Sequence, residues 1–119
     1  MVTSAFSTAG IEGEKPLNLF YKDRRYSLQQ GAPAYTFGRD PQCNQQIDSS
    51  LVSRIHAKIE NRRGKFVLID ESTNGIYLKL DNKNPVFLRR EEMVLQGHGI
   101  ISFGETLDKN EANLIHFSQ

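Results

Sequence analysis

The sequence has one cysteine, no tryptophan and no long apolar segment. Cys43 alone cannot form an intrachain disulfide or a cysteine-based zinc site, and with three histidines in the chain we expect no metal site. The longest apolar run, Phe66 to Ile69, is four residues long, whereas a membrane-spanning helix needs about 20. These absences predict a protein without a metal, a cofactor or a membrane span.

A surplus of charge of one sign is also missing. The chain has 15 lysines and arginines against 14 aspartates and glutamates, so its formal net charge is +1. Broad binding to nucleic acid or to an anionic membrane requires a strongly basic surface. Single-stranded nucleic acid also requires exposed aromatic residues along a basic groove. The composition therefore predicts no nucleic acid and no membrane partner, but it allows a small basic site.

The length of 119 residues fits one domain with its own hydrophobic core. Residues 1–16 are rich in serine, threonine, alanine and glycine, which predicts a flexible N-terminal segment ahead of a domain over residues 17–119. No basic stretch precedes a long apolar run near Met1, so we expect no secretory signal and a cytoplasmic protein.

Short apolar runs separated by turn residues dominate the rest of the chain. The predicted strands are Leu17 to Tyr21, Tyr26 to Leu28, Ala34 to Phe37, Ile55 to Glu60, Lys65 to Asp70, Ile76 to Leu80, Val86 to Leu88, Ile100 to Phe103 and Asn113 to Phe117. Strands that recur every 8–12 residues between glycine, asparagine and proline turns are typical of an antiparallel sandwich or barrel. The fold class is therefore predicted to be all-β.

The segment from Ile55 to Glu60 has the clearest strand pattern. Apolar residues at positions 55, 57 and 59 alternate with polar ones at 56, 58 and 60, which indicates a half-buried strand with the first set facing inward. Residues 89–96 (RREEMVLQ) include good helix formers. Their place between two predicted strands nevertheless favours a short strand.

Two polar stretches are predicted to be loops. Lys22, Arg24 and Arg25 follow the first strand, where we expect a solvated basic cluster. Cys43 lies in the polar stretch from residue 38 to 46, where we expect an exposed thiol.

Three segments that border predicted strands could form a binding site. They are Gly38-Arg39, Ser53-Arg54-Ile55-His56 and Ser72-Thr73-Asn74-Gly75. Together they offer two guanidinium groups, several hydroxyls and an amide, with no paired carboxylates. Such groups donate hydrogen bonds and positive charge, and a phosphate monoester is the natural acceptor. Loops at one end of a rigid sandwich are common binding sites.

The same segments resemble the forkhead-associated (FHA) domain, a module that recognises phosphothreonine. The resemblance comprises Gly38-Arg39, the Ser53-x-x-His56 step, the turn from Asp70 to Gly75 and a closing segment from Leu95 to Gly104. It covers roughly residues 17–117. It implies a two-sheet antiparallel β-sandwich of about eleven strands, with a peptide site in the loops at one end.

The resemblance also implies a role for each matching residue. Arg39 matches the arginine that contacts phosphate and peptide, and Ser53 matches the serine that bonds a phosphate oxygen. Arg54 matches a position that often adds a phosphate contact. Thr73 matches the residue that closes the phosphate pocket, and Asn74 matches the asparagine that holds the peptide main chain.

Other matching positions support the site. Gly38 permits the turn, His56 braces the binding loops by hydrogen bonding, and Gly75 belongs to the same supporting set. Leu51 lies where family members select the residues that follow the phosphothreonine, and a leucine there favours apolar ones. This chain has glutamines at positions 45 and 46, where apolar residues are usual, so we expect a short strand there.

Taken together, these interpretations predict a non-enzymatic phosphothreonine-peptide reader in signalling, monomeric as an isolated domain. The stretch from Ser53 to Leu78 is particularly similar to FHA regions of bacterial nucleotide cyclases, which suggests a regulatory domain of such a protein.

Two alternatives are open. A phosphate-independent scaffold could use a side face of the same sandwich. An enzyme could use Ser53 and His56 as nucleophile and base, but their spacing and the lack of an evident acidic partner argue against it.

Overall fold

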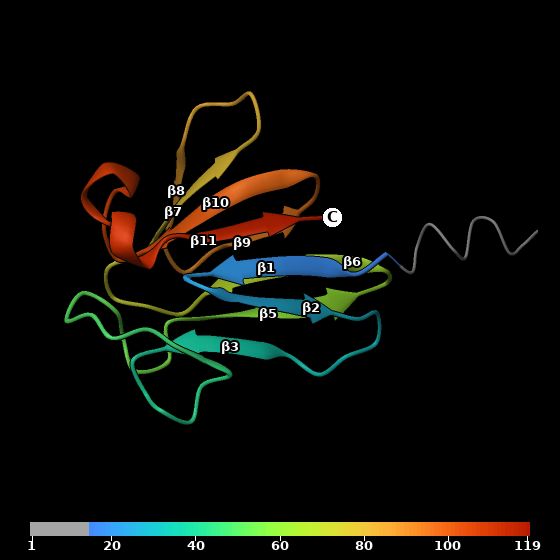
Figure 1. Ribbon diagram of the computed structural model, residues 1–119, viewed down its shortest axis with the longest axis horizontal. Helices are drawn as coiled ribbons and strands as arrows, with labels where there is room; N and C mark the ends of the chain where they lie inside the picture. Colours follow the sequence, from blue (N-terminus) through green and yellow to red (C-terminus); the bar gives the residue numbers. More distant parts are fainter. Residues whose placement is uncertain (1–14) are drawn as a thin grey trace, which may run out of the picture.

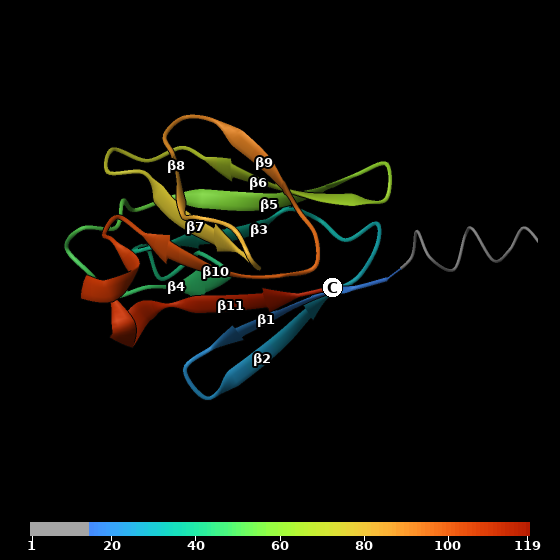
Figure 2. The same ribbon diagram turned by 90° about the horizontal axis from the view of Figure 1, so that it is seen from above.

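The computed structural model describes residues 15–119, which form two packed β-sheets (Figures 1 and 2). The strands are β1 (Leu17–Tyr21), β2 (Arg24–Leu28), β3 (Tyr35–Gly38), β4 (Gln45–Gln46), β5 (Ala57–Arg62), β6 (Lys65–Asp70), β7 (Ile76–Leu80), β8 (Val86–Leu88), β9 (Glu92–Leu95), β10 (His98–Phe103) and β11 (Ile115–Ser118). The prediction of an all-β sandwich is confirmed. Of the predicted flexible segment over residues 1–16, residues 1–14 lie outside the described part of the chain.

The two sheets have distinct strand orders. Six strands form one sheet in the order β2-β1-β11-β10-β7-β8, and five form the other in the order β4-β3-β5-β6-β9. All pairs are antiparallel except β3 with the two-residue β4, which is parallel and as short as predicted. Residues of β2 and β4 line the same cavity, so the two sheets end on the same side of the sandwich at these strands.

Alternating apolar residues from both sheets form the core. In β1, for example, Leu17, Leu19 and Tyr21 face inward and are buried. At the centre, the ring of Phe37 in β3 stacks on that of Phe103 in β10 with centroids 5.1 Å apart. This contact joins the two sheets near the end where β3 finishes and the predicted binding loops begin.

Strand β5 corrects one prediction. It begins at Ala57 instead of Ile55, and the inward and outward faces before it are reversed: His56 is fully buried, whereas Ile55 is 45% exposed. The reason is local, because the backbone N–H of Ser53 donates to Nδ1 of His56 at 3.0 Å. That bond bends the segment, so the alternation of an extended strand does not apply there.

Two loop predictions are also wrong. Arg24 and Arg25 belong to β2, because the chain reverses through a tight two-residue turn at Lys22 and Asp23. Cys43 is buried, and its thiol donates to the carbonyl oxygen of Arg54 at 3.4 Å. Burial raises the pKa of this thiol, so Cys43 is a packing residue beneath the loop.

The remaining elements are short. Residues 92–95 form a strand, as favoured for the ambiguous segment. Two single-turn 3-10 helices, Leu107–Lys109 and Glu111–Asn113, connect β10 to β11. In the described range, no helix is long and apolar enough to span a bilayer.

Gly99 in β10 allows close packing inside the sandwich. A Cβ at this position would lie 2.4 Å from the buried ring of Phe117 and 2.7 Å from the carbonyl oxygen of Lys79. We expect Gly99→Ala to lower the free energy of unfolding by about 1–3 kcal/mol, as overpacking does. Urea denaturation measures the change. In a Phe117→Leu background the same substitution costs less, because leucine leaves room; an equal loss in both backgrounds would contradict this explanation.

Candidate functional site

Three loops meet at the end of the sandwich where β3 and β6 finish and β5 and β7 begin (left in Figure 1). The strand register explains why. Phe37 in β3 pairs with Ala57 in β5, and Ala57 pairs with Asp70 in β6, so the residues just beyond these positions are neighbours. Backbone bonds continue the ladder into the loops, since the N–H of Glu71 donates to the carbonyl of His56 at 2.9 Å.

Gly38 lets the first two loops touch. A Cβ on this residue would lie 2.0 Å from the carbonyl oxygen of Arg54, so no other side chain fits without moving the backbone. The contact is completed by two backbone bonds: Arg39 N–H to Ser53 C=O at 3.0 Å and Asp40 N–H to Arg54 C=O at 3.1 Å. Gly38 is therefore required because the two loops approach closely at this residue. The sequence predicted only that Gly38 permits a turn.

The side chain of Arg39 lies along the second loop. Its Nε donates to the carbonyl oxygen of Val52 at 3.0 Å, which fixes the direction of the guanidinium. Arg39 and Arg54 are both exposed, and neither forms an ion pair among the described residues. Their charges remain available to an anion at this end of the molecule.

The second and third loops are joined through the predicted binding residues. The Ser53 hydroxyl oxygen accepts the backbone N–H of Thr73 at 3.3 Å, and Asn74 Nδ2 donates to the carbonyl of Leu51 at 3.0 Å. Thr73, Asn74 and Leu51 are exposed, and Ser53 is partly so. The structure thus brings together Arg39, Ser53, Thr73 and Asn74, with Leu51 at their border and the exposed Arg54 next to Ser53 in the chain.

His56 lies beneath this surface and fixes it. Because its Nδ1 accepts the Ser53 N–H at 3.0 Å, that nitrogen carries no proton, so Nε2 donates to the carbonyl of Gly75 at 2.7 Å. Burial lowers the pKa of His56, although the bond to Gly75 and the nearby Asp70 carboxylate oppose the shift. The neutral ring therefore holds the second and third loops together.

Asp70 and Ser72 extend the same network. The Asp70 carboxylate accepts the Ser72 hydroxyl at 2.7 Å and the backbone N–H of Arg90 at 2.9 Å. The Ser72 oxygen in turn accepts the N–H of Gly75 at 2.7 Å. Gly75 has a φ of 79°, in the left-handed region, and a Cβ there would also strike the ring of Phe87. No larger side chain therefore fits at position 75 without moving Phe87.

Sequence reasoning missed two arginines before β9. Arg89 Nε donates to the carbonyl of Thr73, and Arg90 Nε donates to that of Ser72, both at 2.8 Å. They fix the outer side of the third loop and add positive charge beside it. The pair was visible in the sequence, but no motif connects it to a loop 16 to 18 residues earlier.

The geometry does not form the serine–histidine couple of a nucleophilic enzyme. Nδ1 of His56 faces the backbone N–H of Ser53, and the Ser53 hydroxyl accepts from Thr73. An acidic neighbour does exist, contrary to expectation, since Asp70 lies 3.6 Å from Nε2 of His56. Its position strengthens the brace, but the histidine has no free nitrogen with which to activate the hydroxyl.

The comparisons with known proteins agree with this architecture. The family model described as FHA domain matches residues 35–104, which include every loop of the site. A search of curated proteins finds no match. Rv1747 FHA-1 from Mycobacterium tuberculosis is similar in structure, with a TM-score of 0.67 and 21% identity over 88% of this chain and 96% of that one.

Two further similar structures are complexes. The FhaA FHA domain, solved with the intracellular domain of Rv3910, has a TM-score of 0.60 and 26% identity, covering 85% of this chain and 98% of its own. The N-terminal FHA domain of Rad53p from S. cerevisiae, solved with a phosphothreonine peptide, has a TM-score of 0.61 and 20% identity, covering 87% and 90%.

The buried His56 makes stability depend on pH. Because its pKa is lowered in the folded protein, below a pH of about 6.5 the unfolded chain binds a proton that the folded state excludes. The stability that the neutral ring contributes is present above that pH and is lost on acidification. We expect the free energy of unfolding to fall between pH 7 and 5.5, by up to about 1.4 kcal/mol per pH unit. Urea denaturation at several pH values measures the slope.

His56→Asn removes this titration, so its slope over the same range should be flatter. His116→Asn, which replaces an exposed histidine in β11, is the matched control. Equal slopes for both variants would contradict the assignment.

Proposed function

Because the chain belongs to the FHA domain family, we propose that it binds phosphothreonine peptides and mediates phosphorylation-dependent interactions between signalling proteins. The observation that supports this function is the meeting of three loops at one end of the sandwich, where hydrogen bonds link Arg39, Ser53 and Asn74 to neighbouring backbone and where Arg54, the next residue after Ser53, is exposed. These are donors of hydrogen bonds and positive charge, which is the chemistry that a phosphate dianion requires.

Each residue has a distinct role in this proposal. Arg39 and Arg54 neutralise the phosphate, and the Ser53 hydroxyl, whose oxygen already accepts from Thr73, donates its own hydrogen to a phosphate oxygen. Thr73 closes the side of the pocket. Asn74 holds the peptide main chain with the amide atoms that its bond to Leu51 leaves free.

Supporting residues keep these groups in place before the ligand arrives. Gly38, His56 and Gly75 set the separations of the loops, so little rearrangement is needed on binding. Leu51 is 40% exposed at the border of the site and would contact apolar residues that follow the phosphothreonine.

Several wider interpretations belong to the same proposal. We take residues 17–119 as the domain, monomeric on its own, without catalytic activity and acting in the cytoplasm. Its role in control of a nucleotide cyclase stays a prediction from the sequence resemblance. In support of peptide binding, a similar domain was solved with a phosphothreonine peptide.

Loss of the Arg39 guanidinium should weaken phosphopeptide binding. A charge-assisted hydrogen bond contributes about 1.5–3 kcal/mol net, so we expect Arg39→Ala to raise the Kd by about 10- to 100-fold. Isothermal titration with a degenerate phosphothreonine peptide library, and then with its best member, measures the change. Arg63→Ala is the charge-matched control, since Arg63 lies in the exposed β5–β6 turn.

The same titration separates the phosphate-dependent reader from the phosphate-independent scaffold. The unphosphorylated peptide should bind far more weakly, because the arginines then lack a counter-charge. Equal affinity for both peptides, unchanged by Arg39→Ala and Ser53→Ala, would reject the proposal and favour the scaffold.

Affinity should also depend on the charge of the phosphate. The second ionisation of phosphothreonine lies near pH ~6, so affinity should fall below that pH as the dianion gains a proton. A peptide with a difluoromethylene phosphonate in place of the phosphate stays dianionic to lower pH. We expect its affinity to persist further into the acidic range. Identical pH profiles for the two ligands would instead place the titrating group on the protein.

A further inference from the structure

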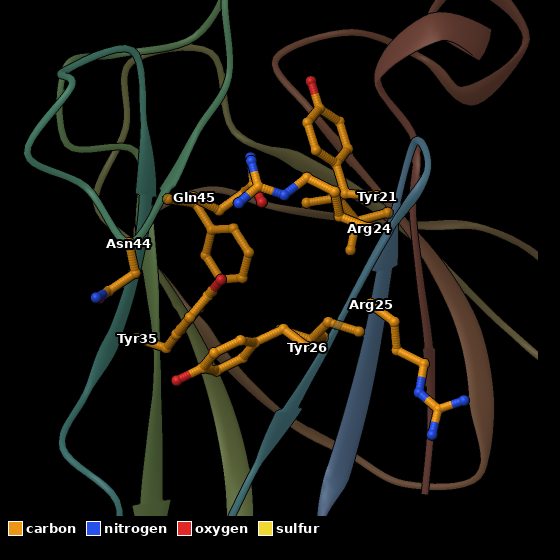
Figure 3. A pocket seen from close by; sticks show the side chains of 10 residues that line it. Tyr21, Arg24, Arg25, Tyr26, Tyr35, Asn44 and Gln45 are labelled. Carbon is orange, nitrogen blue, oxygen red and sulfur yellow. The ribbon is translucent and has the colours of Figure 1, made fainter.

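A cavity of about 200 Å³ lies between the two sheets on the side where they end at β2 and β4. Leu19, Phe37 and Ile115 form its apolar floor, and tyrosine, arginine and amide side chains form its walls (Figure 3). It shares no lining residue with the phosphate site proposed above. A ligand bound at this cavity would therefore contact residues other than those of the phosphate site.

Two stacked tyrosines keep the sheets apart here. Tyr26 in β2 stacks on Tyr35 in β3 with ring centroids 4.8 Å apart and planes 29° from parallel. Tyr26 is 52% exposed although it points to the inner face of its sheet, as the pairing of β2 with β1 requires. Figure 2 shows the β1–β2 hairpin diverging from β3 and β5. The gap between the sheets therefore follows from large tyrosine side chains at inward positions of β2 and β3.

Arg24 places an unmatched positive charge at the cavity. Its side chain extends from β2 toward Gln45, whereas Arg25 points away (Figure 3). Burial, followed by the neighbouring Tyr26, raises the pKa of Tyr35, and the charge of Arg24 opposes that shift. Asp23 precedes Arg24 in the chain, and Asp48 lines a neighbouring pocket together with Arg24. Neither forms an ion pair with Arg24 within residues 15–119.

Beside the cavity, β2 has an edge that the described residues do not cover. Within residues 15–119, β2 pairs with β1 alone. The hairpin turn has two residues, so the pairs Tyr21–Arg24 and Leu19–Tyr26 exchange hydrogen bonds. The backbone N–H and C=O groups of Arg25 and Ser27 then face outward, where an added strand would find them.

We propose that this edge binds an extended acidic segment of a partner protein, which adds a strand to β2 and inserts one apolar side chain into the cavity. The volume suits one side chain, since pockets for larger ligands span about 300–1,000 Å³. Strand addition combines main-chain hydrogen bonds with pockets for alternate side chains. Carboxylates on the segment supply the counter-charge that Arg24 lacks.

A peptide without phosphate tests this site separately from the phosphate site. The probe is the capped hexapeptide Thr-Glu-Thr-Phe-Thr-Glu, whose glutamates lie on the same face of the extended strand as its phenylalanine and can therefore reach Arg24. Its lysine counterpart Thr-Lys-Thr-Phe-Thr-Lys is the charge control. In amide NMR spectra of the isotope-labelled chain, we expect saturable shifts at Arg25, Ser27 and the side-chain amides of Asn44 and Gln45. The lysine peptide should cause none of these shifts.

Two pairs of variants identify the contacts. Ser27→Pro removes an outward N–H without breaking the ladder to β1, and it should abolish binding, whereas Ser27→Ala keeps the N–H and should bind as the wild type does. Arg24→Ala should raise the Kd about threefold, the usual effect of an exposed ion pair, whereas Arg63→Ala should not. If Ser27→Pro does not fold, the probe with N-methylated alternate amides replaces it and should fail to bind.

Several results would overturn the proposal. They are equal binding of the two peptides, shifts confined to the loops around Arg39, or equal affinity of Ser27→Pro and Ser27→Ala. Shifts that grow with protein concentration in the absence of peptide would assign the edge to a second copy of the chain, and would also reject an acidic partner segment.

Discussion

The arrangement of the binding loops depends on one buried, neutral imidazole. His56 has one acceptor and one donor nitrogen, and these reach Ser53 in one loop and Gly75 in the next. Its ring also packs edge-on against Phe103, which belongs to the opposite sheet, at 5.3 Å. A single side chain therefore ties two loops to the core. The cost of burying it is offset because both ring nitrogens are satisfied. The exposed groups above it need not be ordered by the ligand.

Most strands could be predicted because hydrophobic alternation and turn residues act locally. The prediction failed where a side chain competes with the extended backbone. Ile55 and His56 continue the alternating pattern of β5, but the bond from Ser53 to His56 turns the imidazole inward. The sequence predicts a loop at Arg24 because charged residues in succession are typical of turns. In fact its inward position faces a gap between the sheets, where a long cationic side chain can remain hydrated.

For the candidate site, the sequence predicts the exposed residues but not the hydrogen-bond network that supports them. The motif residues predict which loops form the site, and these loops meet at one end of the sandwich; the binding role of each side chain stays a prediction. The network behind them could not be derived in the same way, because it runs through backbone carbonyls far apart in the sequence. Arg89 and Arg90 contact the carbonyls of Thr73 and Ser72, and only the return of the chain before β9 brings them near. Neither the amino-acid composition nor the spacing of motifs predicts contacts of this kind.

A net charge near zero is compatible with a phosphate site because some basic side chains form ion pairs with carboxylates and others do not. Lys58 and Arg62 of β5 form ion pairs with glutamates of β5, of β9 and of the segment just after β6, and Arg62 lowers the pKa of both Glu60 and Glu92. Arg39 and Arg54 have no such partners among the described residues. Salt screens exposed charges beyond about 8 Å under physiological conditions, so the field of these two arginines is local. A field of such short range favours a single phosphate group in contact with the arginines. An extended polyanion would require positive charge along a much longer surface.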